Sequence, residues 1–527
     1  MLRFRKVRMQ IVLGLVAVIA LCLVIRMDHH DGRLSSLQLT EKDFDAIVGR
    51  ASETDSDLVQ TIRFNDEKLF YDRDSDTFFY SLIENDVERF DPEVSFETFG
   101  TGIKLGFLET ELNEQDIENN RTYDLIAYNS DSWHVYHLKC TTLPMMNIKT
   151  EHEISGDPPV TFKMEMFDNR AEADVRYFDS VGTIHYRGAS TSSYPKIGYK
   201  IKLYTSIGKT NKRNVSLLGM REDSSWMLYP GYTDPLRVRN VFSSVFWNRS
   251  CASSNAFGLA NGYELKYIEL FVNDSYHGLY ALGFMPDEKM LQIDESQHEV
   301  MYKDRQWFDF TDPNKYPYDE VFKIVNDFSG FSEYDTSDRW KDLLDYCAVL
   351  NSGASFDEMM NYVDHDNYID FWLFMYLLQG VDQAEEVNVK NFIITAKNTG
   401  DGYRMVYTPW DMDRTWGLGF KRDSTDVTLT RPFMFGPFGI YDPDHNEEVF
   451  QMLSGRYAEL RSTKWSDDNL AELMDEFDSQ IFKSGAYQRD IERWPTSYIM
   501  EPPYGLGTFK EYVLQRMEYC DEYFLND

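Results

Sequence analysis

Residues 408–417 read TPWDMDRTWG, so two carboxylates, Asp411 and Asp413, stand one residue apart directly after a β-like run. A pair of this kind can bind a hard cation or take part in proton transfer. An anchored turn and a solvated acidic loop are the two simpler interpretations. Because an Asp-x-Asp sequence is common in loops, the neighbouring elements have to decide among the three interpretations.

The segment around this acidic pair predicts a β-hairpin. The β-like runs NFIITAK and YRMVYTP flank the turn-forming residues NTGDG, which centre on Gly400. Chain reversal there brings Asn391, which opens the first strand, beside Asp411 and Asp413. Asp382 follows the end of an apolar helix, a short loop before the hairpin. One edge of the hairpin is therefore expected to gather three carboxylates and one amide.

Such a set of oxygen ligands suits Mg²⁺ or Mn²⁺. A cation held by one or two carboxylates keeps positions for substrate phosphates, and a further aspartate can accept the proton of an attacking hydroxyl. This division of roles belongs to phosphoryl transfer. A metal-dependent phosphohydrolase shares the carboxylates but should also supply histidine ligands, and the nearest histidine, His365, stands well before the hairpin.

Residues 185–204, HYRGASTSSYPKIGYKIKLY, are the best candidate for a phosphate-binding segment. A strand turns through RGASTSS, whose backbone N–H groups could cover phosphates together with Arg187. The chain then resumes as a strand that carries Lys196, Lys200 and Lys202. Lys200 and Lys202 share one face of this strand because they are two residues apart. The segment is neither a GxxxxGK[ST] loop nor a GxGxxG loop, so a basic hairpin that pairs with acidic surface residues is the alternative.

The composition limits the classes of function. Over 527 residues the formal net charge is −35, so most of the surface would repel a phosphate backbone, and we expect no nucleic-acid partner. Hydrophobic residues make up 43% of the chain, which is enough for a sizeable core. The five cysteines show no CxxC or Cys/His spacing, which disfavours a zinc site and favours buried free thiols over disulfides.

The N-terminus carries a targeting signal, in which basic residues precede an apolar run over residues 11–25. This pattern predicts a cytoplasmic basic tip and a transmembrane anchor over residues 1–27. The N-terminus would then be cytoplasmic and the rest of the chain extracytoplasmic. A cleaved signal peptide, and hence a secreted protein, is the alternative, but no convincing small-x-small cleavage site follows the run.

Three further parts follow along the chain. Residues 28–60 are polar and predict a tether. Residues 61–150 contain short β-rich runs separated by turn residues, which is typical of a small β-sandwich. Residues 151–527 begin with strands and continue with helices, which predicts an α+β domain.

Four stretches of this last part resemble the CotH kinase family, named after spore coat protein H. They are YRGASTSSYPKIGYKIKL, YPGYTDPLRVRNVFSSVFW, YIELFVNDSYHGLYAL, and DNYIDFWLFMYLLQGVDQAEEVNVKNFIITAK together with MVYTPWDMDRTWG. The last is the most specific, because it joins a helix, an aspartate, a KN-strand and P-W-D-x-D-x-x-x-G. The resemblance covers residues 155–420. The chain departs from the family's pattern at Asp274, where glycine is usual, and at Phe284, where glutamate is usual.

This resemblance implies an atypical protein-kinase-like fold that binds ATP with Mg²⁺ or Mn²⁺ and phosphorylates Ser or Thr of a protein substrate. It makes Asp382 the catalytic aspartate. Asn391 and Asp411 would be metal ligands, with Asp413 in a ligating or supporting role. The ATP phosphates would be held by Arg187 and by a lysine among Lys196, Lys200 and Lys202.

An exported domain meets little ATP, so a second class of hypothesis stays open. In this hypothesis the protein is an exported surface or spore-coat interaction protein that uses a kinase-like fold as a scaffold, with little or no transferase activity. The two hypotheses differ in a measurable way, because binding of a partner would survive replacement of Asp382 or Asp411.

Overall fold

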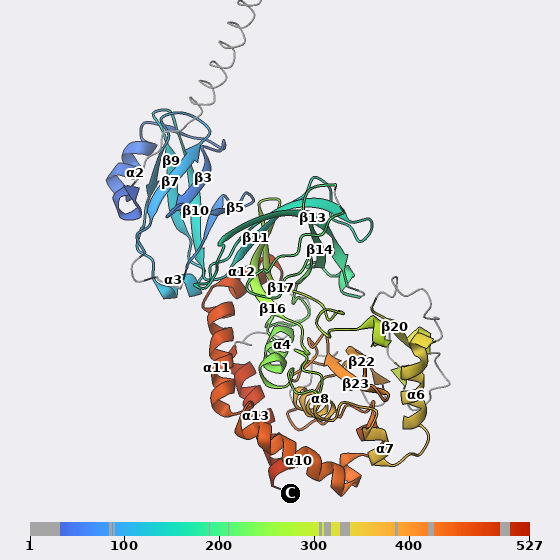
Figure 1. The fold of residues 1–527 in the computed structure, drawn as a ribbon. Coiled ribbons are helices and arrows are strands. Elements are labelled where there is room, and N and C mark those ends of the chain that lie inside the picture. The colour runs from blue at the N-terminus through green and yellow to red at the C-terminus, as the bar shows by residue number, and fades with distance from the viewer. Residues whose placement is uncertain are drawn as a thin grey trace, which may run out of the picture.

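The computed structural model (Figure 1) describes residues 32–83, 87, 90–188, 190–208, 210–304, 308–309, 318–326, 338–384, 388–419, 426–495 and 506–526. These residues have a mixed α+β structure, as the sequence predicts. The predicted anchor over residues 1–27 lies outside them. None of the helices within the described ranges is long and apolar enough to cross a membrane.

Residues 32–141, here called the N-terminal unit, form two sheets over a shared hydrophobic core. The first sheet has the order β1 (Gly32–Arg33), β7 (Glu93–Thr98), β3 (Val59–Phe64) and β4 (Glu67–Lys68). The second has the order β5 (Phe70–Asp72), β6 (Thr77–Ser81), β10 (Ser132–Thr141), β9 (Tyr123–Tyr128) and β8 (Lys104–Phe107), with β2 (Ser52–Glu53) beside β10. Its short helical segments are η1 (Leu34–Leu37), α2 (Glu41–Val48) and α3 (Glu114–Glu118).

The first and last residues of this unit differ from those predicted for the tether and the β-sandwich. Part of the predicted tether belongs to the unit, because β1 pairs with β7 and Leu34 is buried in the core. A capping box between Thr40 and Asp43 then starts α2. At the other end, β11 (Met145–Lys149) pairs with strands of the next sheet instead of the N-terminal unit.

Seven strands after residue 141 close into one sheet. Their order is β11, β12 (Val160–Phe167), β13 (Tyr177–Arg187), β14 (Gly198–Tyr204), β15 (Ser225–Tyr229), β17 (Ser275–Gly283) and β16 (Leu265–Val272), and β16 returns to β11. All neighbours are antiparallel except β11 and β16. Residues 185–204, the segment predicted to bind phosphates, lie in the β13–β14 hairpin, whose strands are joined through the short helix η2 (Ser190–Ser193).

A second sheet carries the predicted hairpin. Its order is β20 (Phe322–Ile324), β18 (Val300–Asp304), β22 (Phe392–Asn398) and β23 (Tyr403–Pro409). β22 pairs with β23 from Phe392 opposite Pro409 to Asn398 opposite Tyr403. Gly400 has a φ of 87° in the connecting turn, a conformation that favours glycine. The predicted hairpin is therefore confirmed. Two shorter strands, β19 (Phe308–Asp309) and β21 (Asn388–Val389), pair separately.

Helix α8 (His365–Leu378) lies against this hairpin. Its residues from Asn367 to Leu378 are all buried, which matches the apolar run in the sequence. The Asn367 amide bonds to the backbone of Tyr407 in β23 in both directions, with distances of 2.6 and 3.1 Å. These bonds fix the helix relative to the hairpin, and the chain leaves the helix at Gln379 with a φ of 53°. The next loop therefore starts at a defined place beside the hairpin.

Further helices surround α8 and the closed sheet. They are α4 (Arg239–Ser250), α5 (Tyr318–Val321), α6 (Lys341–Leu350), α7 (Phe356–Met360), α9 (Pro437–Ile440), α10 (Glu447–Ser462), α11 (Asp467–Phe477), α12 (Ala486–Arg493) and α13 (Leu506–Leu525). Short helical turns are η3 (Glu295–Gln297), η4 (Asp338–Trp340), η5 (Pro443–His445) and η6 (Asp478–Phe482). Figure 1 shows α12 next to β17 of the closed sheet, far along the chain from it.

The N-terminal unit is joined to the closed sheet at the turn between β16 and β17. Asp274 has a φ of 59° in this turn, a backbone conformation that favours glycine. Its carboxylate accepts hydrogen bonds from Arg73 of the N-terminal unit (2.9 Å) and from Asn147 (2.6 Å). Next to it, Phe79 stacks on Tyr276 with ring centres 5.2 Å apart. The departure at Asp274 therefore contributes a contact to the junction.

Candidate active site

A cavity of about 580 Å³ lies where the closed sheet meets the four-stranded sheet. Its walls come from β13 and β15 on one side, and from β18 and the open ends of the β22–β23 hairpin on the other. The predicted site residues that line it are Arg187, Lys196, Asn391, Asp411 and Asp413. The cavity thus brings the acidic edge of the hairpin to the same place as part of the basic segment.

The acidic side chains are held at the ends of the hairpin. Asn391 and Asp411 have φ values of 60° and 55°, so the backbone turns sharply as it enters and leaves the strand pair. Asn391 Nδ2 donates a hydrogen bond to Oδ2 of Asp382 (2.6 Å). Asp413 Oδ2 accepts a hydrogen bond from the hydroxyl of Thr233 (2.8 Å), which comes from the closed-sheet side. The predicted grouping of these oxygen-bearing side chains is present.

The carboxylates act on one another. Burial, opposed by the charge of Lys390 and assisted by that of Asp411, raises the pKa of Asp382 to about 6. Burial also raises the pKa of Asp413 to about 7, with added repulsion from Asp411 and Asp382. These groups therefore lie close enough for their negative charges to compete, and a bound cation would relieve that competition.

The donor set fits a divalent cation of the magnesium type. Oδ1 of Asp382 is buried and has no hydrogen-bond partner in the described part of the chain. No three His, Cys, Asp or Glu side chains among the described residues form a ready metal site, so an all-carboxylate cage is absent there. Mg²⁺ is usually held by one or two carboxylates, with substrate phosphates and waters as the other ligands. Asn391, Asp411 and Asp413 line the cavity and carry side-chain oxygens of the type that this cation takes.

Basic side chains also line the cavity, from both of its sides. Lys303, the next-to-last residue of β18, has its ammonium nitrogen 4.8 Å from the centre of the Trp410 ring. The guanidinium carbon of Arg187 lies 5.7 Å from the same ring centre. Burial lowers the pKa of Lys303 to about 8, so it still carries a charge at neutral pH. Two further lysines line the cavity, Lys323 and Lys390. In a protein of net charge −35, this concentration of cations favours an anionic ligand.

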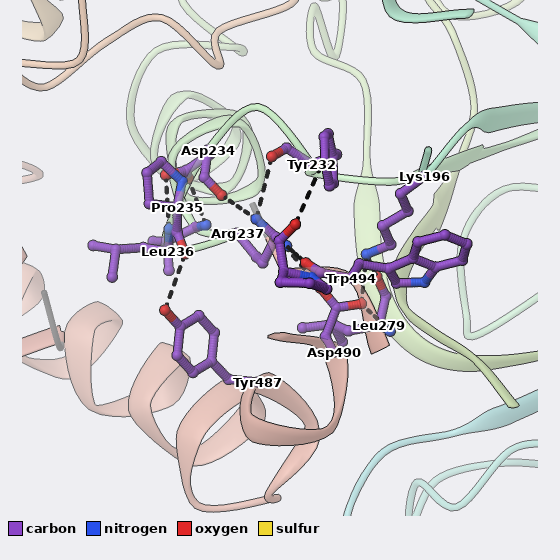
Figure 2. Close-up of polar contacts among 12 residues, drawn as sticks. Lys196, Tyr232, Asp234, Pro235, Leu236, Arg237, Leu279, Tyr487, Asp490 and Trp494 are labelled. Carbon is purple, nitrogen blue, oxygen red and sulfur yellow. Dashed lines mark hydrogen bonds and ion pairs between the residues drawn. The ribbon is translucent and has the colours of Figure 1, made fainter. Parts of the chain in front are cut away.

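Lys196 is held by a buried ion pair (Figure 2). Its ammonium donates to Oδ1 of Asp490 (2.7 Å) and to the carbonyl oxygen of Leu279 (2.5 Å). Arg237 Nε donates to the other oxygen of the same carboxylate (2.8 Å). Burial lowers the pKa of Lys196 to about 8, and Asp490 opposes this effect. Asp490 lies on α12, so a helix near the C-terminus sets the position of a lysine in the cavity wall.

The other two lysines of the basic segment do not line the cavity. In β14 the buried residues Ile201 and Leu203 alternate with Lys200 and Lys202, which therefore share the face that points away from the core. Lys202 is exposed. Lys200 is partly buried, and its pKa is lowered by burial and then by the positive charges of Lys202 and Arg187. The cavity therefore selects Lys196 from the three lysines.

The model of the CotH kinase protein family matches residues 184–520 of the chain. The chain belongs to the CotH kinase protein family. The match confirms the resemblance seen in the sequence and extends beyond residue 420 to include α12 and Asp490. All the predicted site residues lie inside the matched span, whereas the N-terminal unit lies outside it. A search of curated proteins found no match.

Several residues of the cavity wall were missed from the sequence. Lys303 and Asp304 end the run EVMYKD, and a pair of charged residues at the end of a β-like run is the signal that points to them. Asp490 offered no signal, because it stands 294 positions from Lys196 in a region of ordinary amphipathic helices. Tyr229, the last residue of β15, was not singled out either.

Proposed function

We propose that this protein is an ATP- and divalent-metal-dependent protein kinase with a kinase-like fold in residues 151–527. It transfers the γ-phosphoryl group of ATP to a Ser or Thr hydroxyl of a protein substrate. The observation that carries the proposal is the cavity itself, which is lined both by oxygen-bearing side chains and by several cations. Membership of the CotH kinase protein family supports the same class of reaction.

In this proposal Asp382 is the general base. Its pKa of about 6 leaves it ionised at neutral pH and still able to take up a proton. Oδ2 of Asp382 already accepts the hydrogen bond from Asn391, so Oδ1 of Asp382 is the atom that accepts the proton of the attacking hydroxyl. As the hydroxyl oxygen forms a bond to the γ-phosphorus, the bond from that phosphorus to the bridging oxygen breaks, and ADP leaves.

Asp382 does not itself line the cavity but bonds to Asn391, and the residues that do line it bind and orient the nucleotide. Asn391 and Asp411 would hold Mg²⁺ or Mn²⁺, with Asp413 in support. The cation supplies charge neutralisation for the phosphates. Arg187 and Lys303 line the same cavity as these oxygens and attract the phosphate chain. Lys196, fixed by Asp490, adds a positive charge whose position does not depend on the ligand.

The test uses the purified full-length chain with Mn²⁺ and ATP labelled in the γ or the α position, with casein as a probe that bears Ser and Thr. We expect label from γ only, and loss of transfer in Asp382→Ala and Asp411→Ala with a nearly unchanged thermal midpoint. Asp401→Ala is the matched control, because Asp401 is exposed in the turn of the same hairpin. Normal transfer by Asp411→Ala in Mn²⁺ would show that the metal assignment is wrong.

The second candidate function is an exported interaction protein that uses the same fold as a scaffold. The N-terminal unit favours it, because this unit lies outside the family match and carries no part of the cavity. In the same assay this candidate gives no transfer from either label. Label from α alone would instead indicate transfer of AMP.

We also propose that the protein is exported and anchored by its N-terminal apolar run, with cleavage and secretion as the alternative.

A further inference from the structure

Tyr229 presents a buried hydroxyl at the cavity wall. It is the last residue of β15, and its side chain lines the cavity beside Asp411 and Asp413. The hydroxyl oxygen has no hydrogen-bond partner among the described residues. A buried polar group without a partner destabilises the folded protein. The ring alone would fill the same space as phenylalanine, so the hydroxyl needs an explanation.

The surroundings make this hydroxyl a donor. Burial raises the pKa of Tyr229, and the negative charges of Asp413 and Asp411 raise it further, so the phenol keeps its proton. Asn240 interacts with this hydroxyl, but its Oδ1 already accepts hydrogen bonds from Tyr263 (2.6 Å) and from the backbone of Met412 (3.0 Å). The proton of the phenol is therefore left without an acceptor.

We propose that Tyr229 donates its hydroxyl hydrogen bond to a non-bridging phosphate oxygen of the nucleotide bound in the cavity. This inference rests on the proposed function and assigns a positioning residue to it. Tyr229 lines the same cavity as Arg187, Asp411 and Asp413, so it shares that cavity with a phosphate-attracting cation and with the proposed metal ligands. A phosphate that contacts both groups places an acceptor oxygen at this point.

The chain provides a matched control. Tyr376 on α8 also has a buried hydroxyl without a partner among the described residues. It does not line the cavity, and its ring lies under the guanidinium of Arg516, 5.0 Å from the ring centre. Tyr229→Phe and Tyr376→Phe thus remove the same group from the same kind of environment. Only the first variant removes it from the proposed site.

The experiment measures binding and stability of the full-length wild type and both variants. Calorimetry in Mn²⁺ uses a non-hydrolysable ATP analogue, inorganic tripolyphosphate and adenosine as probes. We expect thermal midpoints equal to or above that of the wild type for both variants, because each loses an unsatisfied hydroxyl. Tyr229→Phe should bind the analogue and tripolyphosphate about tenfold more weakly, with adenosine unchanged, whereas Tyr376→Phe should bind all probes as the wild type does.

The outcomes separate this inference from the proposed function. If Tyr229→Phe binds the analogue as tightly as the wild type, the hydroxyl has no role at the phosphates and the inference is overturned. If the wild type binds the analogue but transfers no phosphate, the kinase proposal fails, and the tenfold loss still decides the role of Tyr229. A wild type that binds neither the analogue nor tripolyphosphate overturns both.

Discussion

Asp413 combines a carboxylate with surroundings that disfavour its charge. Its pKa is raised from 3.8 to about 7 by burial and by the neighbouring Asp411 and Asp382. Without a metal, the folded protein therefore holds a proton that the unfolded chain releases above about pH 4. Stability must fall as the pH rises through this window, from about 4 to about 7, because the folded state binds more protons there.

We expect Asp413→Asn to lose this part of the pH dependence. In a chelator, the thermal midpoint of the variant should exceed that of the wild type by an amount that grows between about pH 4 and pH 7, reaching about 2 °C or more. Scanning calorimetry at a series of pH values measures the difference. Asp401→Asn, in the exposed turn, should run parallel to the wild type. If the thermal midpoint of Asp413→Asn also runs parallel to that of the wild type across this pH range, the folded protein does not raise the pKa of Asp413.

Bound Mn²⁺ should counteract the loss of stability that the metal-free protein shows as the pH rises. A cation binds the ionised carboxylates, so it should stabilise the wild type most at high pH, where no proton has to be displaced. Asp413→Asn should gain less from Mn²⁺ at about pH 8, because one negative charge is missing. If Mn²⁺ stabilises both proteins equally, Asp413 does not interact with the metal.

At the scale of elements, the features that could be predicted from the sequence are those that depend on residues close together in the chain. The β22–β23 hairpin followed from two β-like runs and a turn centred on Gly400, and Asn391 and Asp411 then had to lie at its open end. Periodicity also placed Lys200 and Lys202 on one face of β14. Periodicity does not say which face of a strand meets a cavity, so those lysines could not be told apart from Lys196.

Long-range contacts could not be predicted in this way. The partner of Lys196 is Asp490 on α12, and no local pattern links a strand residue to a helix near the C-terminus. The same limit applies to Lys303 of β18, whose place at the cavity depends on β18 pairing with β22. One β-like run can pair with many others, so a single sequence does not determine that choice.

Helix α12 supports the cavity through Asp490. We expect Asp490→Asn to destabilise the protein by about 3–5 kcal/mol, because it leaves the buried cations Lys196 and Arg237 without their shared counter-charge. Transfer and nucleotide binding should be lost as well. Urea unfolding followed by circular dichroism measures the stability. Gln488→Ala, at an exposed position of the same helix, should change it by less than about 0.5 kcal/mol. A stable Asp490→Asn protein would contradict the role of this helix.

At the scale of the whole molecule, α12 also ties the N-terminal unit to the closed sheet. Arg489, the residue before Asp490, forms a buried ion pair with Glu269 of β16. Thr141 of the N-terminal unit donates a hydrogen bond to the same carboxylate (2.8 Å). One buried glutamate thus joins the N-terminal unit, the closed sheet and α12. The exposed pair of Arg73 and Asp274 lies at the same junction.

These two ion pairs should differ in their contribution to the junction. Glu269→Gln leaves the buried Arg489 without a counter-charge and should cost about 3–5 kcal/mol. Arg73→Ala should cost at most about 1 kcal/mol, because the Arg73 side chain is 59% exposed and water screens its pair with Asp274. Calorimetry gives both changes, and limited proteolysis between the N-terminal unit and the closed sheet reports whether the junction opens. Equal costs would mean that the exposed pair, and with it the chain's own departure from the family at Asp274, holds the two parts together as firmly as the buried glutamate does.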